Sequence, residues 1–381
     1  MKKTDYSHQF DSPHSPVTKK QPLLQIIHLD APLLGGMLVL ITLGLLVLYS
    51  ASGQSTDTVI RQLSRLAVGF PIMMVMAQIS PLAYKRWTPW LFLVGTILLI
   101  GVLVTGTEAK GAQRWLAIPG LGRFQPSEIM KVIVPMMLAW YLAERVLPPG
   151  WKPVLLALLL ILVPTLLIAR QPDLGTALLI ASSGLIVLFL AGLSWKLISG
   201  FLIALVPAAG ALWLVMHDYQ KQRVMTFLNP ELDRWGTGWN ITQSKTAIGS
   251  GGWEGKGWLH GTQAQLDFLP ESSTDFIIAV LAEEFGLFGV CSLLFVYFAI
   301  IVRGMFIAMN AQDTYSRLLA GSITLTFFVY VFVNIGMVSG ILPVVGVPLP
   351  MVSYGGTSIV TLMASFGILM SIQTHRRLVA T

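Results

Sequence analysis

The sequence predicts an all-α, polytopic integral membrane protein with about ten transmembrane helices, both termini in the cytoplasm and one long periplasmic loop. Of the 381 residues, 54% are hydrophobic and only 11% are charged, whereas soluble domains average about 45–50% apolar and about 25% charged residues. Apolar runs that match the roughly 20 residues needed to cross a bilayer as a helix recur along the whole chain. These observations exclude soluble globular, disordered, fibrous and nucleic-acid-binding proteins.

Residues 1–30 precede the first apolar run and are expected to form a flexible cytoplasmic tail. The segment is polar and carries two Lys-Lys pairs. It is too long for the amino-terminal region of a cleaved signal peptide, and the apolar run that follows it is long enough to span a membrane. We therefore divide the chain into this tail and a single ten-helix membrane domain, residues 31–377.

Hydropathy divides the membrane domain into ten spans, and each is expected to be a helix because lipid-exposed backbone must satisfy its own polar groups. The spans are residues 31–51, 64–80, 87–106, 126–143, 153–170, 174–192, 196–215, 276–302, 318–339 and 356–373. An even number of crossings leaves both termini on one side of the membrane. The short loops on that side are rich in Lys and Arg, which accounts for the net charge of +7, and the positive-inside rule assigns this side to the cytoplasm.

Two loops on the opposite, periplasmic side stand out by their charge. The long polar loop of residues 216–275, together with the start of the span that follows it, holds half of the 18 acidic residues. The short loop of residues 107–125 is instead basic, with Lys110, Arg114 and Arg123, contrary to the rule that its neighbours obey. We therefore expect any chemistry to face the periplasm.

Glu128 and Lys131 fall inside the fourth predicted span. Their i, i+3 spacing puts both side chains on one face of the helix. Ionisable side chains at this depth are costly and usually mark a functional cavity. The alternative interpretation is a self-neutralising structural pair that fixes helix packing.

A helix start directly precedes this charged pair. In the run Gln125-Pro126-Ser127, the proline suits the first helical position, and the free N–H groups and positive dipole end of a helix start favour an anion. The three cations of the short outer loop would surround the same place. The sequence thus predicts a phosphate or pyrophosphate site at the outer leaflet.

The segment of residues 340–357 is apolar but is broken by three prolines, so it cannot be helical throughout. Irregular backbone near membrane depth is tolerated where it is buried in protein or lines a cavity. A tight interfacial turn is the alternative interpretation. Ser353 and Thr357 belong to the small polar residues that open the tenth span, and these residues form a second candidate anion nest.

Asp275 ends the long outer loop directly before the eighth predicted span. The apolar neighbours Phe276 and Ile277 are expected to raise the pKa of a carboxyl group at the membrane surface, which suits a general base. Capping of the following helix by Thr274 or Asp275 is the alternative. Asp173, before the sixth span, has the same two interpretations, and capping is favoured there.

Motifs of several other chemistries are absent from the sequence. The outer histidines, His217 and His260, lack zinc-ligand spacing. The single cysteine, Cys291, excludes a disulfide framework and a thiolate metal cluster. The sequence therefore predicts no dedicated metal site.

A set of short strings, in consistent order between about residues 28 and 377, resembles the SEDS family and is most similar to its elongation-specific branch. The strings are KGAQRW (110–115), FQPSEIMK (124–131), RQPDLGT (170–176), IGSGG (248–252), GKGWLHGTQ (255–263), LPE (269–271), TDF (274–276), GILPVVGVPLP (340–350) and SYGG (353–356). Each string alone is a weak signal, but together they are highly specific.

The resemblance implies a peptidoglycan glycosyltransferase of the bacterial inner membrane, which polymerises lipid II on the periplasmic side for cell elongation and rod shape. It implies a class B penicillin-binding protein, a transpeptidase, as a partner, together with other membrane proteins of the elongation complex and no nucleic acid. The essential carboxylate of the family corresponds to Asp275, its charged pair to Glu128 and Lys131, and its outer basic motif to Arg114. Many relatives carry His directly before the Thr-Asp pair, whereas this chain has Ser273.

The chemistry of that reaction agrees with the residues. Forming a β-1,4 linkage with inversion requires a base for the acceptor 4-hydroxyl and positive charge for the departing lipid pyrophosphate. By analogy with inverting glycosidases, we assign Asp275 as the base. The pyrophosphate is expected to bind near Lys110, Arg114, Gln125, Ser127, Glu128, Lys131, Ser353 and Thr357, with Glu128 orienting Lys131. A divalent cation, Mg²⁺ or Mn²⁺, could bridge the phosphates, but the sequence offers no dedicated ligands for it.

Two other classes of function remain open at this point. A flippase or transporter of a polyprenyl-linked precursor would suit intramembrane charges and a broken helix. Such a protein is expected to bind its substrate near the midplane between internal repeats, and the sequence contains no repeat. A noncatalytic scaffold for a partner enzyme is the third interpretation.

Overall fold

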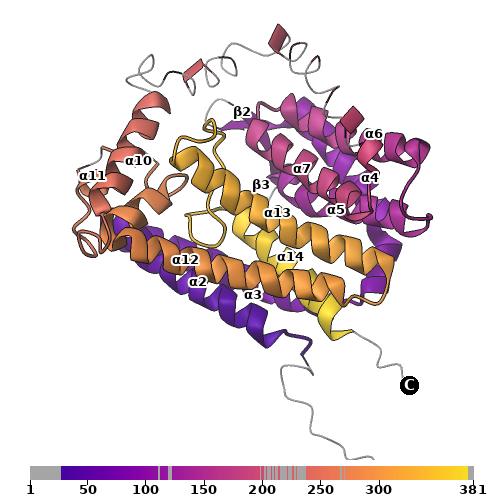
Figure 1. Cartoon of the computed structure of the whole chain (residues 1–381), viewed down its shortest axis with the longest axis horizontal. Helices are drawn as coiled ribbons and strands as arrows, with labels where there is room; N and C mark the ends of the chain where they lie inside the picture. The colour runs from indigo at the N-terminus through magenta and orange to yellow at the C-terminus, as the bar shows by residue number, and fades with distance from the viewer. Residues whose placement is uncertain are drawn as a thin grey trace, which may run out of the picture.

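The computed structural model shows a bundle of long helices with a small sheet and a group of shorter helices at its edge (Figure 1). It describes residues 27–109, 112–118, 122–197, 199, 200, 203, 207, 210, 213, 214, 221, 225, 226, 229, 237–266, 268, 269 and 271–375. Apart from residues 27–30, the predicted tail lies outside the described residues, as do much of the predicted seventh span and part of the long outer loop.

In the part of the chain that the structure describes, nine long helices overlap predicted spans, although α3 and α4 begin eight and six residues earlier than predicted and α12 ends seven residues later. They are α2 (Ala31–Ala51), α3 (Thr56–Gln78), α4 (Pro81–Thr105), α5 (Pro126–Ala143), α6 (Trp151–Ala169), α7 (Leu174–Leu190), α12 (Ile277–Met309), α13 (Thr314–Val338) and α14 (Thr357–Thr374). Seven of them are long and apolar enough to cross a membrane, and α5 and α7 are not among these seven. The helix α7 is apolar but has only 17 residues. The predicted total of ten spans stays a prediction, because residues 196–215 are only partly described.

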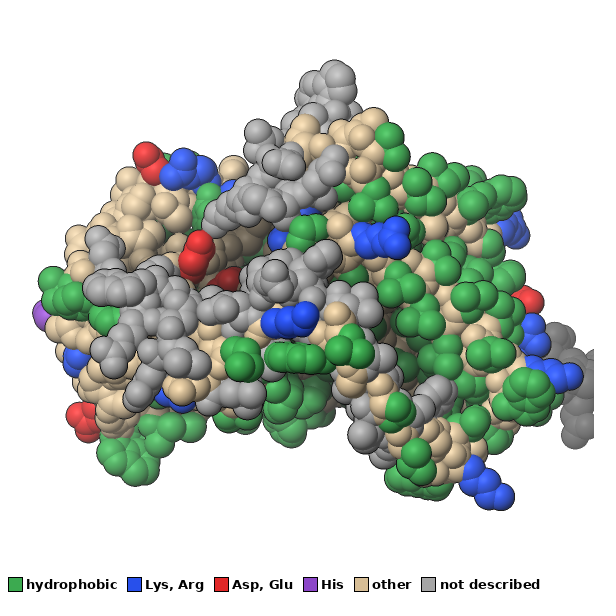
Figure 2. Space-filling view, turned by 90° about the horizontal axis from the view of Figure 1, so that it is seen from above, with side chains coloured by type: hydrophobic (Ala, Val, Ile, Leu, Met, Phe, Trp, Pro, Cys, Tyr) green, Lys and Arg blue, Asp and Glu red, His purple; other side chains and the backbone are tan. Residues whose placement is uncertain are grey.

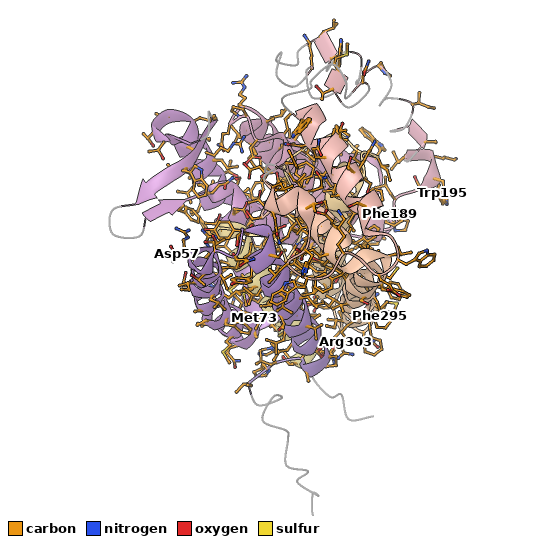
Figure 3. The ribbon with its side chains drawn as sticks, turned by 90° about the vertical axis from the view of Figure 1, so that its left-hand side faces the viewer. Asp57, Met73, Phe189, Trp195, Phe295 and Arg303 are labelled. Carbon is orange, nitrogen blue, oxygen red and sulfur yellow. The ribbon has the colours of Figure 1, made fainter. Side chains whose placement is uncertain are left out.

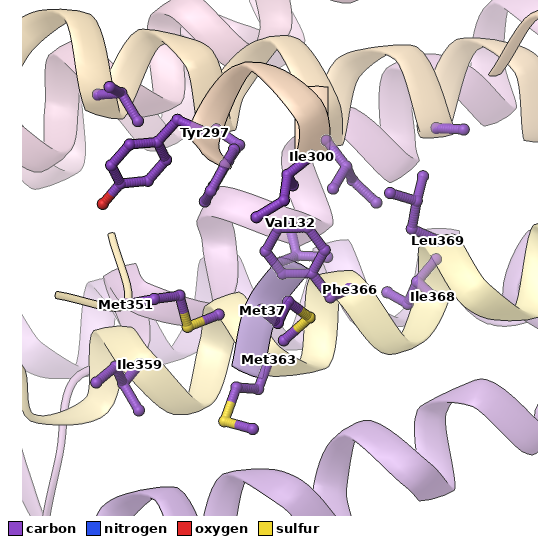
Figure 4. Packing of buried hydrophobic residues seen from close by; sticks show 14 of the residues in the cluster. Met37, Val132, Tyr297, Ile300, Met351, Ile359, Met363, Phe366, Ile368 and Leu369 are labelled. Atoms are coloured by element: carbon purple, nitrogen blue, oxygen red, sulfur yellow. The ribbon is translucent and has the colours of Figure 1, made fainter. Parts of the chain in front are cut away.

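The bundle is apolar both inside and outside, as expected of helices that lie in lipid. Its interior is built from side chains such as Met37 of α2, Tyr297 of α12 and Phe366 of α14, which pack against one another between α2, α5, α12 and α14 (Figure 4). On the outside, Phe189 and Phe295 are 63% and 70% exposed (Figure 3). In water such exposure would be costly, so these faces are suited to contact acyl chains.

One element departs from the all-α prediction. The basic outer loop folds into a three-stranded antiparallel sheet in the order β1 (Thr107–Ala109), β2 (Ala112–Ile118) and β3 (Gly122–Phe124). Paired strands satisfy the backbone polar groups of a segment that leaves α4 and must return to α5. Because successive side chains of a strand point to opposite faces, the neighbours Arg114 and Trp115 of β2 lie on opposite faces of the sheet.

The helix α12 is broken near its start by the packing of the outer loop. Gly286 has φ 60° and ψ −159°, outside the helical region. Loop backbone fills the break: Lys256 N donates to Glu283 O at 3.0 Å, and Leu287 N donates to Gly252 O at 3.0 Å. The segment from Ile277 to the break is therefore a separate half-helix, whose orientation depends on the loop that docks on it.

Buried carboxylates hold this loop against the half-helix. Glu283 is fully buried and accepts hydrogen bonds from Lys256 Nζ at 2.6 Å and Thr262 N at 2.9 Å. Its neighbour Glu284 accepts from Ser50 Oγ of α2. These contacts join α10 (Thr237–Gly251), the short helix α11 (Thr262–Gln265) and the intervening loop to the bundle.

We predict that Gly286→Ala destabilises the protein. An alanine would be strained at φ 60°, and its Cβ would lie 2.5 Å from Trp253 O. Strained backbone positions cost about 1–3 kcal/mol each, so the melting temperature in detergent should fall, as measured by intrinsic tryptophan fluorescence. Gly35→Ala is the matched control, because a Cβ on Gly35 of α2 meets nothing within 4 Å. Equal melting temperatures for both variants would contradict the claim that the helix break requires glycine at position 286.

Candidate functional site

A polar cavity lies between β2, the starts of α5 and α7, α13 and the irregular segment before α14. Five of the residues expected to bind pyrophosphate line it: Arg114, Gln125, Glu128, Lys131 and Thr357. Viewed from above, the molecule has charged side chains around a hollow at one end, whereas apolar side chains dominate the other (Figure 2). Lys110 lies outside the described residues, so its predicted role stays untested.

The charged pair of α5 forms one wall of this cavity. Lys131 Nζ donates to Glu128 Oε1 at 2.6 Å, and both residues are buried. The ammonium also lies 5.4 Å from the centroid of the Tyr330 ring on α13. Glu128 Oε2 is buried without a hydrogen-bond partner among the described residues. The predicted i, i+3 contact is confirmed, and it lies at the edge of a cavity.

The helix start before the pair is also confirmed. Pro126 occupies the first turn of α5 after Gln125. The amide of Gln125 makes no cap hydrogen bond and instead donates to Ser127 Oγ at 3.0 Å and to Asp173 Oδ2 at 3.1 Å. Gln125 therefore connects the start of α5 to the start of α7.

Asp173 caps α7, as the sequence favoured, but it also organises the cavity. Its Oδ1 accepts from Thr176 N at 3.2 Å. Its Oδ2 faces Gln125 and lies 3.8 Å from Arg114 NH1, and the same guanidinium donates to Pro172 O. The side chain of Arg114 is thus aimed at the cavity by Asp173. The sequence did not predict this contact with Arg114. The family motif that contains Asp173, RQPDLGT, was the only indication in the sequence that this residue matters.

Asp275 lies next to the cavity wall. A Cβ built on Gly346, which lines the cavity, would lie 3.4 Å from Asp275 Oδ2. The cap position of α12 is occupied by Phe276, without a side-chain cap hydrogen bond, while Thr274 Oγ1 donates to Glu271 Oε2 at 2.7 Å. Neither Asp275 nor Thr274 therefore occupies the N-cap position of α12, and the role of Asp275 as a base stays a prediction.

The segment between α13 and α14 is irregular, as predicted, and most of residues 347–355 are buried, whereas residues 341–346 are partly or largely exposed. Residues 346–348 and 356–358 line the cavity. Its backbone polar groups find partners on surrounding helices. Tyr297 Oη of α12 donates to Pro350 O at 2.6 Å, and Gln62 Nε2 of α3 donates to Ser353 O at 3.1 Å. Helices of the bundle therefore supply partners for the second half of this segment.

Ser353 connects this segment to the residues that precede Asp275. Its Oγ donates to Thr274 O at 2.5 Å and accepts from Leu349 N at 2.8 Å, and the residue is buried. The next residue, Tyr354, donates its N–H to Ser273 O at 2.9 Å. Ser353 does not line the polar cavity. A contact between Ser353 and substrate stays a prediction, whereas its structural contacts bind the two segments together.

An apolar cavity adjoins the polar one. It is a narrow cleft between α5, α13 and α14, and its lining includes Val132, Phe327 and Phe366. Glu128, Lys131, Tyr330 and Ser358 line both cavities. The charged pair thus stands where a polar compartment meets an apolar one.

The described residues contain no group of three or more His, Cys, Asp or Glu side chains that could hold a metal ion. The two carboxylates in the polar cavity, Glu128 and Asp173, each pair with a cation of the chain, Lys131 and Arg114. Within the part of the chain that the structure describes, the positive charge in this cavity therefore comes from Lys131 and Arg114.

Comparison with known proteins identifies the family. The model of a family described as "Cell cycle protein", which covers FtsW, RodA and SpoVE, matches residues 26–378. The chain belongs to this family. It is the SEDS family that the sequence motifs predict.

Relatives resemble the chain over nearly its whole length. The peptidoglycan glycosyltransferase MrdB of Escherichia coli K12 is 56% identical over 355 residues, which cover 93% of this chain and 96% of the relative. The probable peptidoglycan glycosyltransferase FtsW of Trichlorobacter lovleyi is 37% identical over 365 residues, with 92% and 94% covered.

Solved structures agree with the fold. One chain of a peptidoglycan synthase complex that coordinates polymerization and crosslinking superposes with a TM-score of 0.80 at 29% identity, covering 92% of this chain and 98% of the other. The rod shape determining protein RodA of Thermus thermophilus gives a TM-score of 0.67 at 27% identity, with 90% and 95% covered.

We predict that replacing only one residue of the Glu128–Lys131 pair destabilises the protein more than replacing both. Glu128→Gln or Lys131→Met alone leaves a buried charge without its partner, which costs about 3–5 kcal/mol. The double variant, which carries no charge there, should recover most of that loss. Thermal unfolding of the two single variants and the double variant in detergent measures this cycle. Additive losses in the double variant would mean that the two charges do not interact.

Proposed function

We propose that the chain is a peptidoglycan glycosyltransferase that polymerises lipid II on the periplasmic side of the bacterial inner membrane. One observation supports this most directly: the Asp275 carboxylate lies beside Gly346, which lines the cavity together with Arg114 and Lys131. Glycosyl transfer from a lipid pyrophosphate requires a base close to cations, and this arrangement provides both. The name of the Escherichia coli relative supports the same reaction.

In the proposed reaction Asp275 takes the proton from the 4-hydroxyl of the acceptor sugar. The resulting oxygen attacks the anomeric carbon of the donor sugar, and the bond between that carbon and the pyrophosphate oxygen breaks. The electron pair leaves with the polyprenyl pyrophosphate, and the anomeric configuration inverts. A positioned base typically contributes about 10²–10⁴-fold to the rate of such a step.

Arg114 and Lys131 receive the charge that develops on the leaving group. Each is held by a carboxylate of the chain, Asp173 for Arg114 and Glu128 for Lys131. Cations fixed before the reaction need no reorganisation when charge develops, which is the main source of electrostatic catalysis. The paired carboxylates also keep the cavity close to neutral when substrate is absent.

The apolar cavity is suited to the start of the polyprenyl chain. It lies between α5, α13 and α14 and shares Glu128 and Lys131 with the polar cavity. A lipid pyrophosphate has the same arrangement, since its charged head is joined directly to a hydrocarbon tail. This match accounts for why Lys131 lies at the boundary between the two compartments.

We further propose that a class B penicillin-binding protein is the partner of this chain. The similarity to a chain of a complex that coordinates polymerization and crosslinking supports this assignment. Other membrane proteins of the elongation complex would join the same assembly.

We predict that Asp275→Ala abolishes polymer formation while the protein remains folded. The full chain, purified in detergent alone and with a class B penicillin-binding protein, is incubated with lipid II, and glycan strands are resolved on gels. The variant loses the base, so its rate should fall by at least about 10²-fold. Glu254→Ala is the matched control, because it removes an exposed carboxylate of the outer loop and should retain wild-type activity.

Two outcomes would contradict the proposal. Polymer from folded Asp275→Ala at the wild-type rate would remove Asp275 from the reaction. No polymer from folded wild-type protein, alone or with the partner, would contradict glycosyl transfer and favour the flippase.

We also predict that Arg114→Gln weakens binding of the lipid pyrophosphate. The variant loses a charge-assisted contact and leaves Asp173 facing the substrate without its cation. Such contacts are worth about 1.5–3 kcal/mol, so the KM for lipid II should rise by about tenfold or more. Arg86→Gln, at the opposite predicted side of the membrane, is the control. An unchanged KM in Arg114→Gln would contradict the phosphate site.

A further inference from the structure

Asn334 of α13 lies between the base and the cavity wall. It is fully buried, and its Nδ2 donates to Asp275 O at 2.8 Å and to Val347 O at 2.7 Å. The first carbonyl belongs to the residue that carries the base, and the second belongs to the irregular segment that lines the polar cavity. One nitrogen therefore joins the two parts of the site.

We infer that Asn334 is a positioning residue that fixes the Asp275 carboxylate relative to the pyrophosphate cavity. This inference rests on the proposed function and extends it to a side chain that does not line the polar cavity. Asn334 acts through the backbone of Asp275, and it fixes Val347, whose neighbour Gly346 lies against Asp275 Oδ2.

The chemistry of the site accounts for an amide at this position. Both acceptors are carbonyl oxygens, so the side chain must provide two donors on one atom, and a neutral NH₂ group does this without adding a buried charge. A serine hydroxyl can donate to one carbonyl only, and an alanine to none. The orientation of the amide follows from the two carbonyls, since only its nitrogen can donate to them.

The half-helix behind Asp275 makes such a fixing contact necessary. Because α12 is broken at Gly286, the segment before the break is not held in place by one continuous helix. Ser353 Oγ and Tyr354 N bind the carbonyls of Thr274 and Ser273, and Asn334 binds the carbonyl of Asp275 itself. A displacement of about 1 Å at a reacting group can cost about 10²-fold in rate, so a single lost contact here has a measurable effect.

The test compares kcat and KM for lipid II in the full chain with its transpeptidase partner. The variants are Asn334→Ala and Asn334→Ser, with Ser322→Ala as the control. Ser322 lies on the same helix, is fully buried, and donates to Ser183 O of α7 at 3.0 Å. The control therefore removes one interhelical hydrogen bond of α13 far from Asp275.

We expect kcat of Asn334→Ala to fall by about 10²-fold with little change in KM, because Arg114 and Lys131 remain in place. Asn334→Ser should lie between this variant and wild type, since it keeps one donor. A kcat of Asn334→Ala as high as that of Ser322→Ala would overturn the inference. So would failure of both Asn334 variants to fold while Ser322→Ala folds, because Asn334 would then be a general structural residue. The proposed function is judged separately, by whether the wild-type protein makes polymer.

Discussion

The site depends on one constraint: the irregular backbone of residues 340–356 enters the helical bundle, and most of residues 347–355 are buried there, where backbone polar groups must find partners in the protein. Three prolines prevent a helix there. Side chains of Gln62, Tyr297 and Asn334 bond to its carbonyls from three different helices. These bonds gather α3, α12 and α13 around the segment, and the segment in turn forms a wall of the polar cavity and contacts the residues around Asp275.

Charge in the site is arranged in pairs before any substrate binds. Lys131 is bonded to Glu128 at the inner end of the cavity, and Arg114 is held near Asp173 at the outer end. An unpaired charge at the depth of Lys131 would be costly, so this buried cation needs Glu128 for the fold to be stable. Arg114 is one-third exposed, and Asp173 orients it more than it neutralises a buried charge. A pyrophosphate with its lipid would share both cations with their carboxylates.

The sequence predicted those parts of the site whose signal is local. Pro126 marks the start of α5, the i, i+3 spacing of Glu128 and Lys131 predicts their contact, and the prolines after α13 predict irregular backbone. Each follows from residues a few positions apart. Hydropathy located the long helices for the same reason, because a span of apolar residues is a local property.

The features that the sequence did not predict depend on contacts between segments that are far apart in the chain. The role of Asp173 toward Arg114 and that of Asn334 toward Asp275 arise only when separate helices meet. The break at Gly286 is equally hidden, since it exists because the outer loop inserts its backbone there. The small sheet was missed because the basic composition of its loop said nothing about strand pairing.

The most direct test of the account is a cryo-electron microscopy structure of the Asp275→Asn variant in lipid nanodiscs with lipid II bound. The variant keeps the size of the side chain but lacks the base, so substrate should accumulate. We predict that the pyrophosphate lies between Arg114 and Lys131, that its lipid chain enters the cavity between α5, α13 and α14, and that an acceptor 4-hydroxyl faces residue 275. A pyrophosphate bound elsewhere, with this cavity occupied only by water, would contradict the account.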